Sequence, residues 1–359
     1  MREKKESSNS NSKKATILDV AHLARVSPTT VSNVLNGRLD RMGQETVERI
    51  QQTIELLGYT PSRVARQLKT GHAPIIGLIV PSVANPFWGA FARAAEETAL
   101  VHGYHVLLGN SERDLAREQL YAEEMWAQGT RGIIFGSSPL SLGHLAGLIE
   151  RGLHVVAFDR YSQRNDDLNV DSVSIDNVLA GRLATRHLLA LGHRRIGFLS
   201  GPIRTISRLD RLEGYRSELT EAGIELDPCL IWEGALSSTF GDIEGAKLGR
   251  RGAQEILGRE NRPTALIAIN DMYALGAYAG ARDLGLRVPD TCSIVGFDDI
   301  MLAEIAEPPL TTIRQPLEDM LRVAVEQLIE HLDKSATSRV IHRAFAPELI
   351  VRGSTAPAS

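Results

Sequence analysis

The chain has 359 residues, of which 43% are hydrophobic, and its formal net charge is −4. This length exceeds one average domain and predicts two or three. No run of the roughly 18 apolar residues that a membrane span needs occurs, and the first residues, MREKKESSNSNSKK, are polar, so we expect a cytoplasmic protein without a secretory signal. Only Cys229 and Cys292 are present. Two cysteines are too few for a disulfide framework or a cysteine-ligated metal, and we expect both to be packing residues.

The charge is unevenly distributed along the chain. Residues 1–70 contain 12 Lys and Arg against 7 Asp and Glu, a surplus of +5, which leaves −9 on the rest of a chain whose net charge is −4. A basic surface attracts the phosphate backbone of DNA. A small surplus is also typical of a solvated tail, and residues 1–13, rich in Ser, Asn and Lys, are expected to be a disordered arm.

Residues 16–36, TILDVAHLARVSPTTVSNVLN, predict two short helices joined by a tight turn. Thr16 can cap the first helix, and Asp19 three residues later can complete a capping box. Ser27 repeats the capping role, and Pro28 occupies the first helical position, where its missing N–H has no consequence. The second helix is therefore expected to begin at Pro28.

Apolar residues of the second helix recur at helical spacing, which leaves its other face polar and uncharged. Such side chains reach base edges or phosphates, and a helix that enters the major groove presents its N-terminal residues first. The residues that we expect to contact DNA in this segment are Thr16, Ser27, Pro28, Thr29, Thr30, Ser32, Asn33 and Asn36. An ordinary helical hairpin is the alternative that the segment alone leaves open.

Residues 15–70 resemble the headpiece of the LacI/GalR (lactose-repressor) family of bacterial transcription regulators. The resemblance rests on the pattern DVAxxAxVSxxTVSxVLNG, which runs here from Asp19 to Gly37. Where the family usually has a glycine in the turn, this chain has Arg25, and a left-handed backbone there would cost an arginine roughly 1–2 kcal/mol. The resemblance implies a helix-turn-helix headpiece that binds DNA.

A third helix is predicted over residues 44–57, because apolar residues step by three and four there and Gly58 follows as a stop signal. Residues 60–71 indicate one short helix and a linker, and so short a helix is marginal alone. The resemblance implies a hinge helix that orders on an operator and inserts a leucine into the minor groove, with Ala65 and Leu68 at the matching positions. A plain amphipathic linker is the alternative.

From residue 75 onward, short apolar runs alternate with segments of helical period. The predicted strands are Ile75–Val80, Tyr104–Leu108, Gly132–Gly136, His154–Phe158, Arg195–Leu199, Ala265–Ile269 and Ser293–Phe297. The predicted helices include Phe87–Val101, Leu115–Gln128, Asn177–Leu191, Asp210–Ala222 and Met272–Leu284. This alternation predicts an α/β fold with two halves, each a doubly wound parallel sheet with helices on both faces.

Ligands of such sheets bind beyond the carboxyl ends of the strands, so the residues that follow each apolar run are the candidates for a binding site. They are Asn85, Phe87, Trp88, Asp159, Arg160, Ser207, Arg211, Asn270 and Asp298. Polar groups of these types bind hydroxyls and a flat ring covers an apolar C–H face, which suits a polyhydroxyl ligand. Each residue also has a structural alternative, because Asp after a strand often caps the next helix and Asn can fix a turn.

The region from Ile75 to Ser354 also resembles the periplasmic-binding-protein-like sensor of the same family. The resemblance implies that these residues, Arg160 excepted, line a cleft between two subdomains together with Gln315, and Phe240 is a weaker candidate. We expect a disordered arm over 1–13, a helix-turn-helix headpiece over 14–60, a hinge helix and linker over 61–73, and a ligand-sensing, dimerising domain over 74–355.

Signatures of enzymes are missing from the sequence, which has no GxGxxG, GxxxxGK, HExxH or GxSxG. The pairs His102 with His105 and His187 with His193 are expected to be ordinary surface histidines rather than metal ligands. We therefore expect no enzyme activity, no metal and no cofactor. A transport-type sugar-binding protein is a second rival, but it would need export.

The residues and the resemblance together predict a DNA-binding regulator whose operator affinity is controlled by a small molecule, with a sugar or sugar derivative as the favoured class, and the resemblance implies that it is a repressor. A homodimer would place two recognition helices on a pseudo-palindromic operator in double-stranded DNA. No heptad helix for a tetramer follows Ser354. Release by an inducing sugar is the commoner pattern in the family, and a sensor domain kept only for dimerisation is the alternative.

Overall fold

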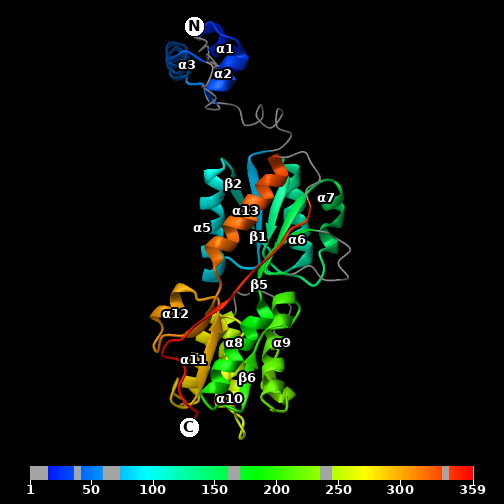
Figure 1. Cartoon of the computed structure of the whole chain (residues 1–359), viewed down its shortest axis with the longest axis vertical. Coiled ribbons are helices and arrows are strands. Elements are labelled where there is room, and N and C mark those ends of the chain that lie inside the picture. Colours follow the sequence, from blue (N-terminus) through cyan, green and yellow to red (C-terminus); the bar gives the residue numbers. More distant parts are fainter. Residues whose placement is uncertain are drawn as a thin grey trace, which may run out of the picture. The chain divides into compact units, whose positions relative to one another are not determined.

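The computed structural model (Figure 1) describes residues 15–35, 42–59, 73–160, 170–234, 245–333 and 339–358. The chain forms two compact units, which divide between Ala73 and Pro74. The predicted arm and most of the predicted hinge, with Asn36, Ala65, Leu68 and Phe240, lie outside the described residues. The finer domain boundaries therefore stay a prediction.

The first unit contains a small helical core. Its described helices are α1 (Ile17–Leu23), α2 (Pro28–Leu35) and α3 (Gln44–Leu57). The side chains buried between them are Val20, Ala21, Ala24, Val31 and Ile50. All three helices contribute to this core, because apolar residues three or four apart share one helical face.

Local hydrogen bonds set the ends of these helices. The capping box at Thr16 is present, with its backbone N–H donating to Oδ2 of Asp19 at 2.8 Å. Oγ of Ser27 accepts from the backbone N–H of Thr30 at 3.1 Å. Arg25 in the turn has a φ of 54°, so an arginine adopts the left-handed conformation that glycine adopts without strain.

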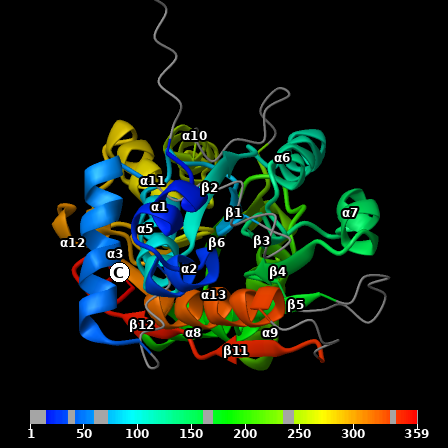
Figure 2. The same ribbon diagram turned by 90° about the horizontal axis from the view of Figure 1, so that it is seen from above.

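The second unit has two lobes, and the first of them, the N-lobe, is built on a parallel sheet of six described strands in the order β11-β5-β4-β3-β1-β2. The strands are β1 (Ile75–Val80), β2 (His105–Asn110), β3 (Gly132–Phe135), β4 (His154–Phe158), β5 (Asp171–Ile175) and β11 (His342–Phe345). Figure 2 shows α5 (Pro86–Val101) and α13 (Leu317–Asp333) on one face, with α6 (Leu115–Ala127) and α7 (Ala146–Glu150) on the other.

The other lobe, the C-lobe, is built on a sheet of six described strands in the order β12-β10-β9-β8-β6-β7. The strands are β6 (Ile196–Leu199), β7 (Ile231–Trp232), β8 (Ala265–Ala268), β9 (Ser293–Phe297), β10 (Thr311–Arg314) and β12 (Glu348–Ile350). Its helices are α8 (Asn177–Ala190), α9 (Ile206–Glu221), α10 (Gly245–Leu257), α11 (Asp271–Asp283) and α12 (Met301–Ile305). The predicted parallel sheet is confirmed for the other described pairings of this lobe, and β12 departs from it because it pairs antiparallel with β10.

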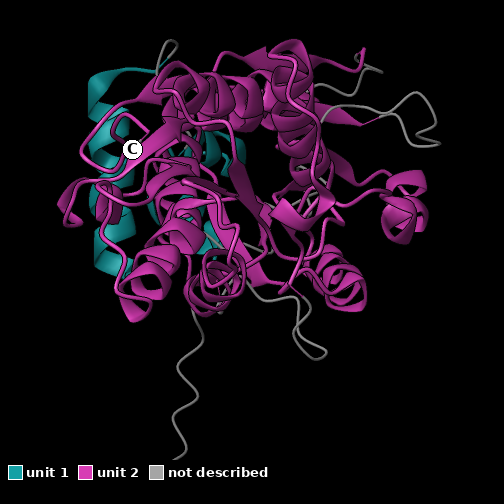
Figure 3. Ribbon diagram, turned by 90° about the horizontal axis from the view of Figure 1, so that it is seen from below, with its two compact units in different colours: residues 1–73 teal, residues 74–359 magenta. Residues whose placement is uncertain are grey.

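The two lobes form one compact unit, shown in magenta in Figure 3. Where the chain is described, it passes between the lobes after β5, after β10, and between β11 and β12. Several connections of this kind act as a hinge, because a few residues at element ends can absorb a rotation of one lobe against the other.

Close contact between α8 and α9 fixes the backbone beside the lobe boundary. A Cβ atom added to Gly181 on α8 would lie 2.2 Å from the backbone oxygen of Arg211 on α9. Only glycine permits this approach, so the contact fixes the backbone of α9 at Arg211. The predicted start of this helix at Asp210 was wrong, because Thr205 caps it and α9 begins at Ile206.

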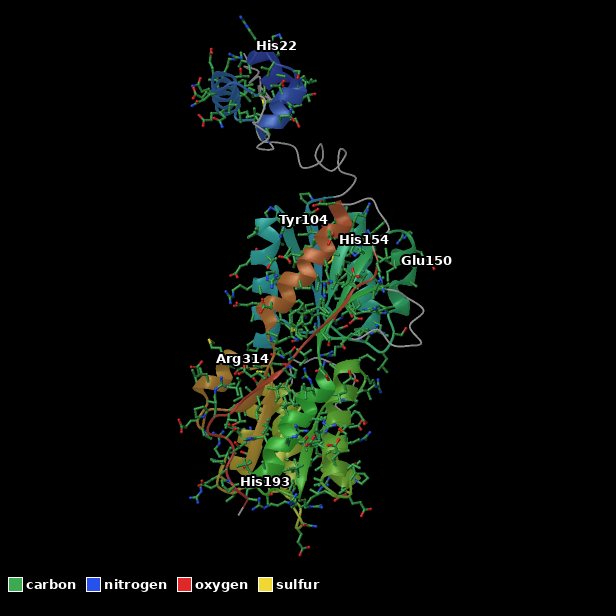
Figure 4. All side chains as sticks on the ribbon, in the orientation of Figure 1. His22, Tyr104, Glu150, His154, His193 and Arg314 are labelled. Atoms are coloured by element: carbon green, nitrogen blue, oxygen red, sulfur yellow. The ribbon has the colours of Figure 1, made fainter. Side chains whose placement is uncertain are left out.

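Two expectations about single side chains were wrong. Cys229 is exposed, whereas Cys292 is buried as predicted. His193, labelled in Figure 4, is only 3% exposed, and its ring nitrogens lie 2.8 Å from Oγ1 of Thr264 and 3.0 Å from Oγ of Ser293. Burial lowers the pKa of His193, so this histidine is a buried structural group.

No helix in the described part of the chain is long and apolar enough to cross a membrane.

Candidate functional site

The outer face of α2 is the candidate DNA-contacting surface. Ser27, Pro28 and Thr29 are exposed, while Thr30, Ser32 and Asn33 are half-buried. The hydroxyls of Ser27 and Thr30 lie 2.9 Å apart, so both are partly engaged in the cap. Thr16 is likewise engaged, because its Oγ1 donates to Asp19 at 2.7 Å. Thr29 and Asn33 take no part in these capping contacts.

A second candidate site lies at the boundary between the lobes, and we call it the inner cleft. It is lined by Asn85, Phe87, Trp88, Arg113, Asp159, Ser207, Arg208, Arg211, Ile269, Asn270, Asp298 and Gln315. Nine of the ten predicted residues therefore come together, from both lobes. Arg113, Arg208 and Ile269 were not predicted, and Arg160 does not line the cleft.

Arg160 follows Asp159 directly but its guanidinium lies elsewhere. Nε donates to the backbone oxygen of Pro139 at 2.9 Å and Nη2 to that of Leu140 at 3.2 Å. Asp159 directly after β4 has a left-handed backbone, with a φ of 56°, so the extended strand ends before these two residues. Asp159 lines the cleft, whereas Arg160 braces the neighbouring loop.

Strand ends and helix starts supply most of the cleft. Asp159 follows β4 and Asp298 follows β9, with φ values of 56° and 105°. Such positive values are strained for any residue with a side chain, and strained residues cluster at functional sites. Asn85 and Asn270 cap α5 and α11, so the structural roles that the sequence left open are present alongside the cleft position.

Arg211 lies at the centre of the polar groups. Nη1 donates to the backbone oxygen of Ile269 at 2.8 Å, and Nε donates to Oδ1 of Asn177 at 2.8 Å. Nη2 lies 3.8 Å from the carboxylate of Asp159 and 3.9 Å from that of Asp298. One buried cation thus faces one carboxylate of each lobe.

Two amides hold these carboxylates in place. Nδ2 of Asn177 donates to Asp159 at 2.7 Å, and Nε2 of Gln315 donates to Asp298 at 2.9 Å. Gln315 is 6% exposed, and its amide oxygen has no hydrogen-bond partner within the described residues. A buried acceptor without a donor is unfavourable, so this oxygen is available to a ligand hydroxyl.

The lobes touch beside the cleft through Ser138. The backbone N–H of Ile206 donates to the backbone oxygen of Ser138 at 3.1 Å, and Oγ of Ser138 donates to the backbone oxygen of Asp159 at 2.7 Å. The inner cleft has a volume of about 30 Å³, about the space of one water molecule. A sugar ring therefore requires the lobes to separate before it enters.

Comparison with known proteins identifies the family. A model described as bacterial regulatory proteins, lacI family, matches residues 16–62, and one described as a periplasmic binding protein-like domain matches residues 185–355. The HTH-type transcriptional regulator DegA of Bacillus subtilis (strain 168) is 35% identical over 346 residues, which cover 96% of this chain and 99% of that protein. The chain belongs to the LacI family.

Solved structures of two transcriptional regulators share the fold. The lac repressor dimer bound to operator and the anti-inducer ONPF has a TM-score of 0.80 and 28% identity, covering 96% of this chain and 100% of that one. A complex of the transcriptional regulator CelR with cellobiose has a TM-score of 0.69 and 30% identity, covering 95% and 99%. The predicted headpiece and periplasmic-binding-protein-like sensor are confirmed.

Membership of the LacI family settles the class of function. The protein is a DNA-binding transcriptional regulator, and the prediction that it is no enzyme is confirmed because its relatives are regulators. In the described part of the chain, no three His, Cys, Asp or Glu side chains come together in a way that could hold a metal ion.

Proposed function

We propose that this LacI-family regulator is a repressor whose operator affinity is controlled by a small polyhydroxyl molecule, a sugar or sugar derivative, bound in the inner cleft. The observation that carries the proposal is the position of Arg211 between Asp159 of the N-lobe and Asp298 of the C-lobe. Guanidinium groups donate to hydroxyl oxygens and carboxylates accept from hydroxyls. A polyol held by all three would tie the lobes together.

The aromatic groups of the cleft support the same ligand class. Phe87 and Trp88 are buried and meet edge to face with ring centroids 5.0 Å apart. Both line the cleft beside the polar cluster. An apolar wall next to a few convergent polar groups is typical of small-molecule sites, and it suits the C–H face of a sugar ring.

DNA binding is proposed to use α2 in the major groove, with Thr29 and Asn33 at base edges and the hinge leucine, Leu68, in the minor groove. Two protomers would bind a pseudo-palindromic operator. The similar lac repressor structure is a dimer on its operator. Because the target is chromosomal DNA, we place the protein in the cytoplasm.

Control of DNA binding would follow from lobe movement. A ligand that prefers one arrangement of the lobes shifts the population toward it, and DNA affinity changes by the same coupling free energy. The N-lobe follows the hinge segment in the chain, so rotation of the N-lobes in a dimer would decide whether two hinge segments meet on DNA. We propose that the sugar favours the arrangement that releases DNA.

The test is a thermal-shift screen of the full-length dimer against monosaccharides, disaccharides, sugar phosphates and nucleobases. A ligand that binds only the folded state raises the melting temperature. We expect a neutral sugar to raise it and, in a fluorescence anisotropy titration at fixed salt, to weaken binding to an operator selected from randomised DNA. If a nucleobase is the only compound that raises the melting temperature, the proposal that the effector is a sugar is wrong.

The remaining outcomes of this screen also decide between hypotheses. A sugar that binds without changing operator affinity would overturn allosteric control. If no compound shifts the melting temperature while the operator still binds tightly, the sensor domain serves dimerisation and the small-molecule proposal is wrong.

A further inference from the structure

A much larger cavity, which we call the outer chamber, adjoins the inner cleft. The two share Arg113 of the N-lobe and Arg208 of the C-lobe as lining residues. The outer chamber has a volume of about 590 Å³ against about 30 Å³ for the inner cleft. Its size falls in the range of ligand sites, roughly 300–1,000 Å³.

Both lobes build this chamber. The N-lobe contributes the loop after β2 and the start of α6, and the C-lobe contributes the segment from Pro202 to Thr205 that leads into α9. The lobes are joined along its edge by a bridge between Pro139 and Thr205. A molecule in the chamber therefore senses the same lobe arrangement as one in the inner cleft.

The walls combine apolar platforms with charges of both signs. Leu115 is 50% exposed and Leu140 49% exposed, although both are large apolar residues. Arg117 and Glu112 form an ion pair of 2.7 Å on the same wall. Apolar surfaces beside paired donors and acceptors fit the C–H face and the hydroxyls of a sugar.

A buried network fixes the boundary between the two cavities. Glu118 is fully buried and accepts from Oγ of Ser137 at 2.6 Å. The backbone oxygen of the same serine accepts from Nη1 of Arg113 at 2.7 Å. Arg113, whose φ is 57°, is thus held where it lines both the inner cleft and the outer chamber.

We propose that the outer chamber is a second subsite for a neutral sugar unit, so that the effector is a disaccharide or another glycoside with a sugar-sized second unit. The inference rests on the proposed function, because the first unit would occupy the inner cleft after the lobes separate. The charges of the lining nearly balance, with four arginines against three carboxylates. The arginines also already donate to protein groups, Arg117 to Glu112, Arg113 to the backbone oxygen of Ser137 and Arg208 to that of Pro202. A neutral unit therefore fits this space, because no excess of unengaged cations awaits an anionic substituent.

The test uses isothermal titration of the full-length protein with maltose, cellobiose, lactose, sucrose and trehalose, each compared with its constituent monosaccharides. We expect one disaccharide to bind at least about tenfold more tightly than its monosaccharides. Glucose 6-phosphate and trehalose 6-phosphate form the anionic arm, and we expect neither to bind more tightly than its neutral counterpart.

A bulky substitution then assigns the extra affinity to the chamber. Leu140 lines the outer chamber and not the inner cleft, so Leu140→Trp should fill space in the outer chamber. We expect it to weaken binding of the disaccharide by about tenfold while monosaccharide affinity stays within about twofold. The matched control is Leu284→Trp, at a leucine that is 40% exposed and lines neither cavity. Leu115→Trp repeats the test from another position if the first variant is unstable.

The outcomes separate this inference from the proposed function. If monosaccharides bind as tightly as every disaccharide, or if Leu140→Trp and Leu115→Trp leave the disaccharide unaffected, the second subsite is wrong and the sugar sensor stands. If a sugar phosphate binds more tightly than its neutral counterpart, the proposal that the second unit is neutral is wrong. If no sugar of any kind binds, both proposals are wrong.

Discussion

Nη2 of Arg211 lies 3.8 Å from Oδ2 of Asp159, and this ion pair crosses the boundary between the C-lobe and the N-lobe. The side chains are 6% and 13% exposed, and the same nitrogen lies 3.9 Å from Asp298. Two carboxylates share one cation, and beside them the buried amide oxygen of Gln315 has no hydrogen-bond partner among the described residues. A hydroxyl group of a ligand can supply that donor.

Replacing Arg211 should therefore remove ligand response and destabilise the sensor. Arg211→Gln leaves two carboxylates facing each other, and breaking a buried ion pair costs about 3–5 kcal/mol. We expect chemical denaturation to show that the free energy of unfolding falls by an amount near the lower end of this range. We also expect the rise in melting temperature that the sugar causes to vanish. Arg250→Gln is the control, because Arg250 pairs with Asp283 at the surface and its loss should cost less than about 1 kcal/mol.

Two observations would contradict the role of Arg211. One is a normal sugar-dependent shift in Arg211→Gln. The other is a failure of Asp159→Asn to recover any stability when it is added to Arg211→Gln, because removing one carboxylate should relieve the repulsion between the two.

The second prediction concerns base recognition by Asn33 on α2. An asparagine that bonds an adenine edge contributes about 1–3 kcal/mol of discrimination. Asn33→Ala should therefore relax the preference at one base pair of each half-site in a selection from randomised DNA. Gln51→Ala, on an exposed part of α3, should leave the preferred sequence unchanged. An identical consensus for Asn33→Ala and the wild type would reject base contact by this residue.

The helix ends of the headpiece could be predicted because they depend on neighbouring residues. Thr16 and Asp19 form the expected capping box, and Gly58 ends α3 as expected. The rule that ligands bind beyond the carboxyl ends of parallel strands, here called the strand-end rule, also located most of the inner cleft, since Asp159 and Asp298 follow recognisable apolar strands. These signals are local in sequence, so tertiary contacts did not alter them.

The remaining features depend on contacts that a single sequence does not reveal. β5, DSVSI, reads as polar, yet all five of its residues are buried between neighbours in the sheet. Arg113 follows β2 by three residues, so the strand-end rule could have found it, but the predicted strand ended two residues early at Leu108. Arg208 was missed because α9 was expected to begin only at Asp210.

The third prediction uses the strained turn at Arg25, where φ is 54°. Glycine adopts this conformation without strain, whereas a residue with a side chain loses about 1–2 kcal/mol, and the greater freedom of unfolded glycine offsets about 0.5–1 kcal/mol of that. Arg25→Gly should thus stabilise the headpiece by up to about 1.5 kcal/mol. Slower amide hydrogen exchange in α1 and α2 of the full-length protein would report it.

Gly58→Ala is the control for Arg25→Gly, and it is expected to destabilise the headpiece rather than stabilise it. Gly58 has a φ of 56° with nothing within 4 Å of an added Cβ, so Gly58→Ala introduces strain without a clash. Exchange in α3 should become faster. Unchanged or faster exchange in Arg25→Gly would show that the arginine makes a compensating contact in the folded headpiece.

The last prediction concerns the pH dependence of stability through Asp210 on α9. Burial raises the pKa of this carboxyl to about 6, and the charge of Asp159 adds to the effect. An unfolded Asp titrates near about 3.9, so between about pH 4 and about pH 6 the folded chain binds more protons than the unfolded chain. The contribution of Asp210 to stability therefore falls as the pH rises through this window.

Asp210→Asn removes the ionisation, so the free energy of unfolding of the variant relative to wild type should rise across the window and level off above it, as measured by urea denaturation at each pH. Asp290→Asn, at an exposed carboxyl of the same lobe, should differ from wild type by less than about 1 kcal/mol throughout. A difference for Asp210→Asn that stays flat from acid to neutral pH would show that the carboxyl keeps an ordinary pKa in the folded protein.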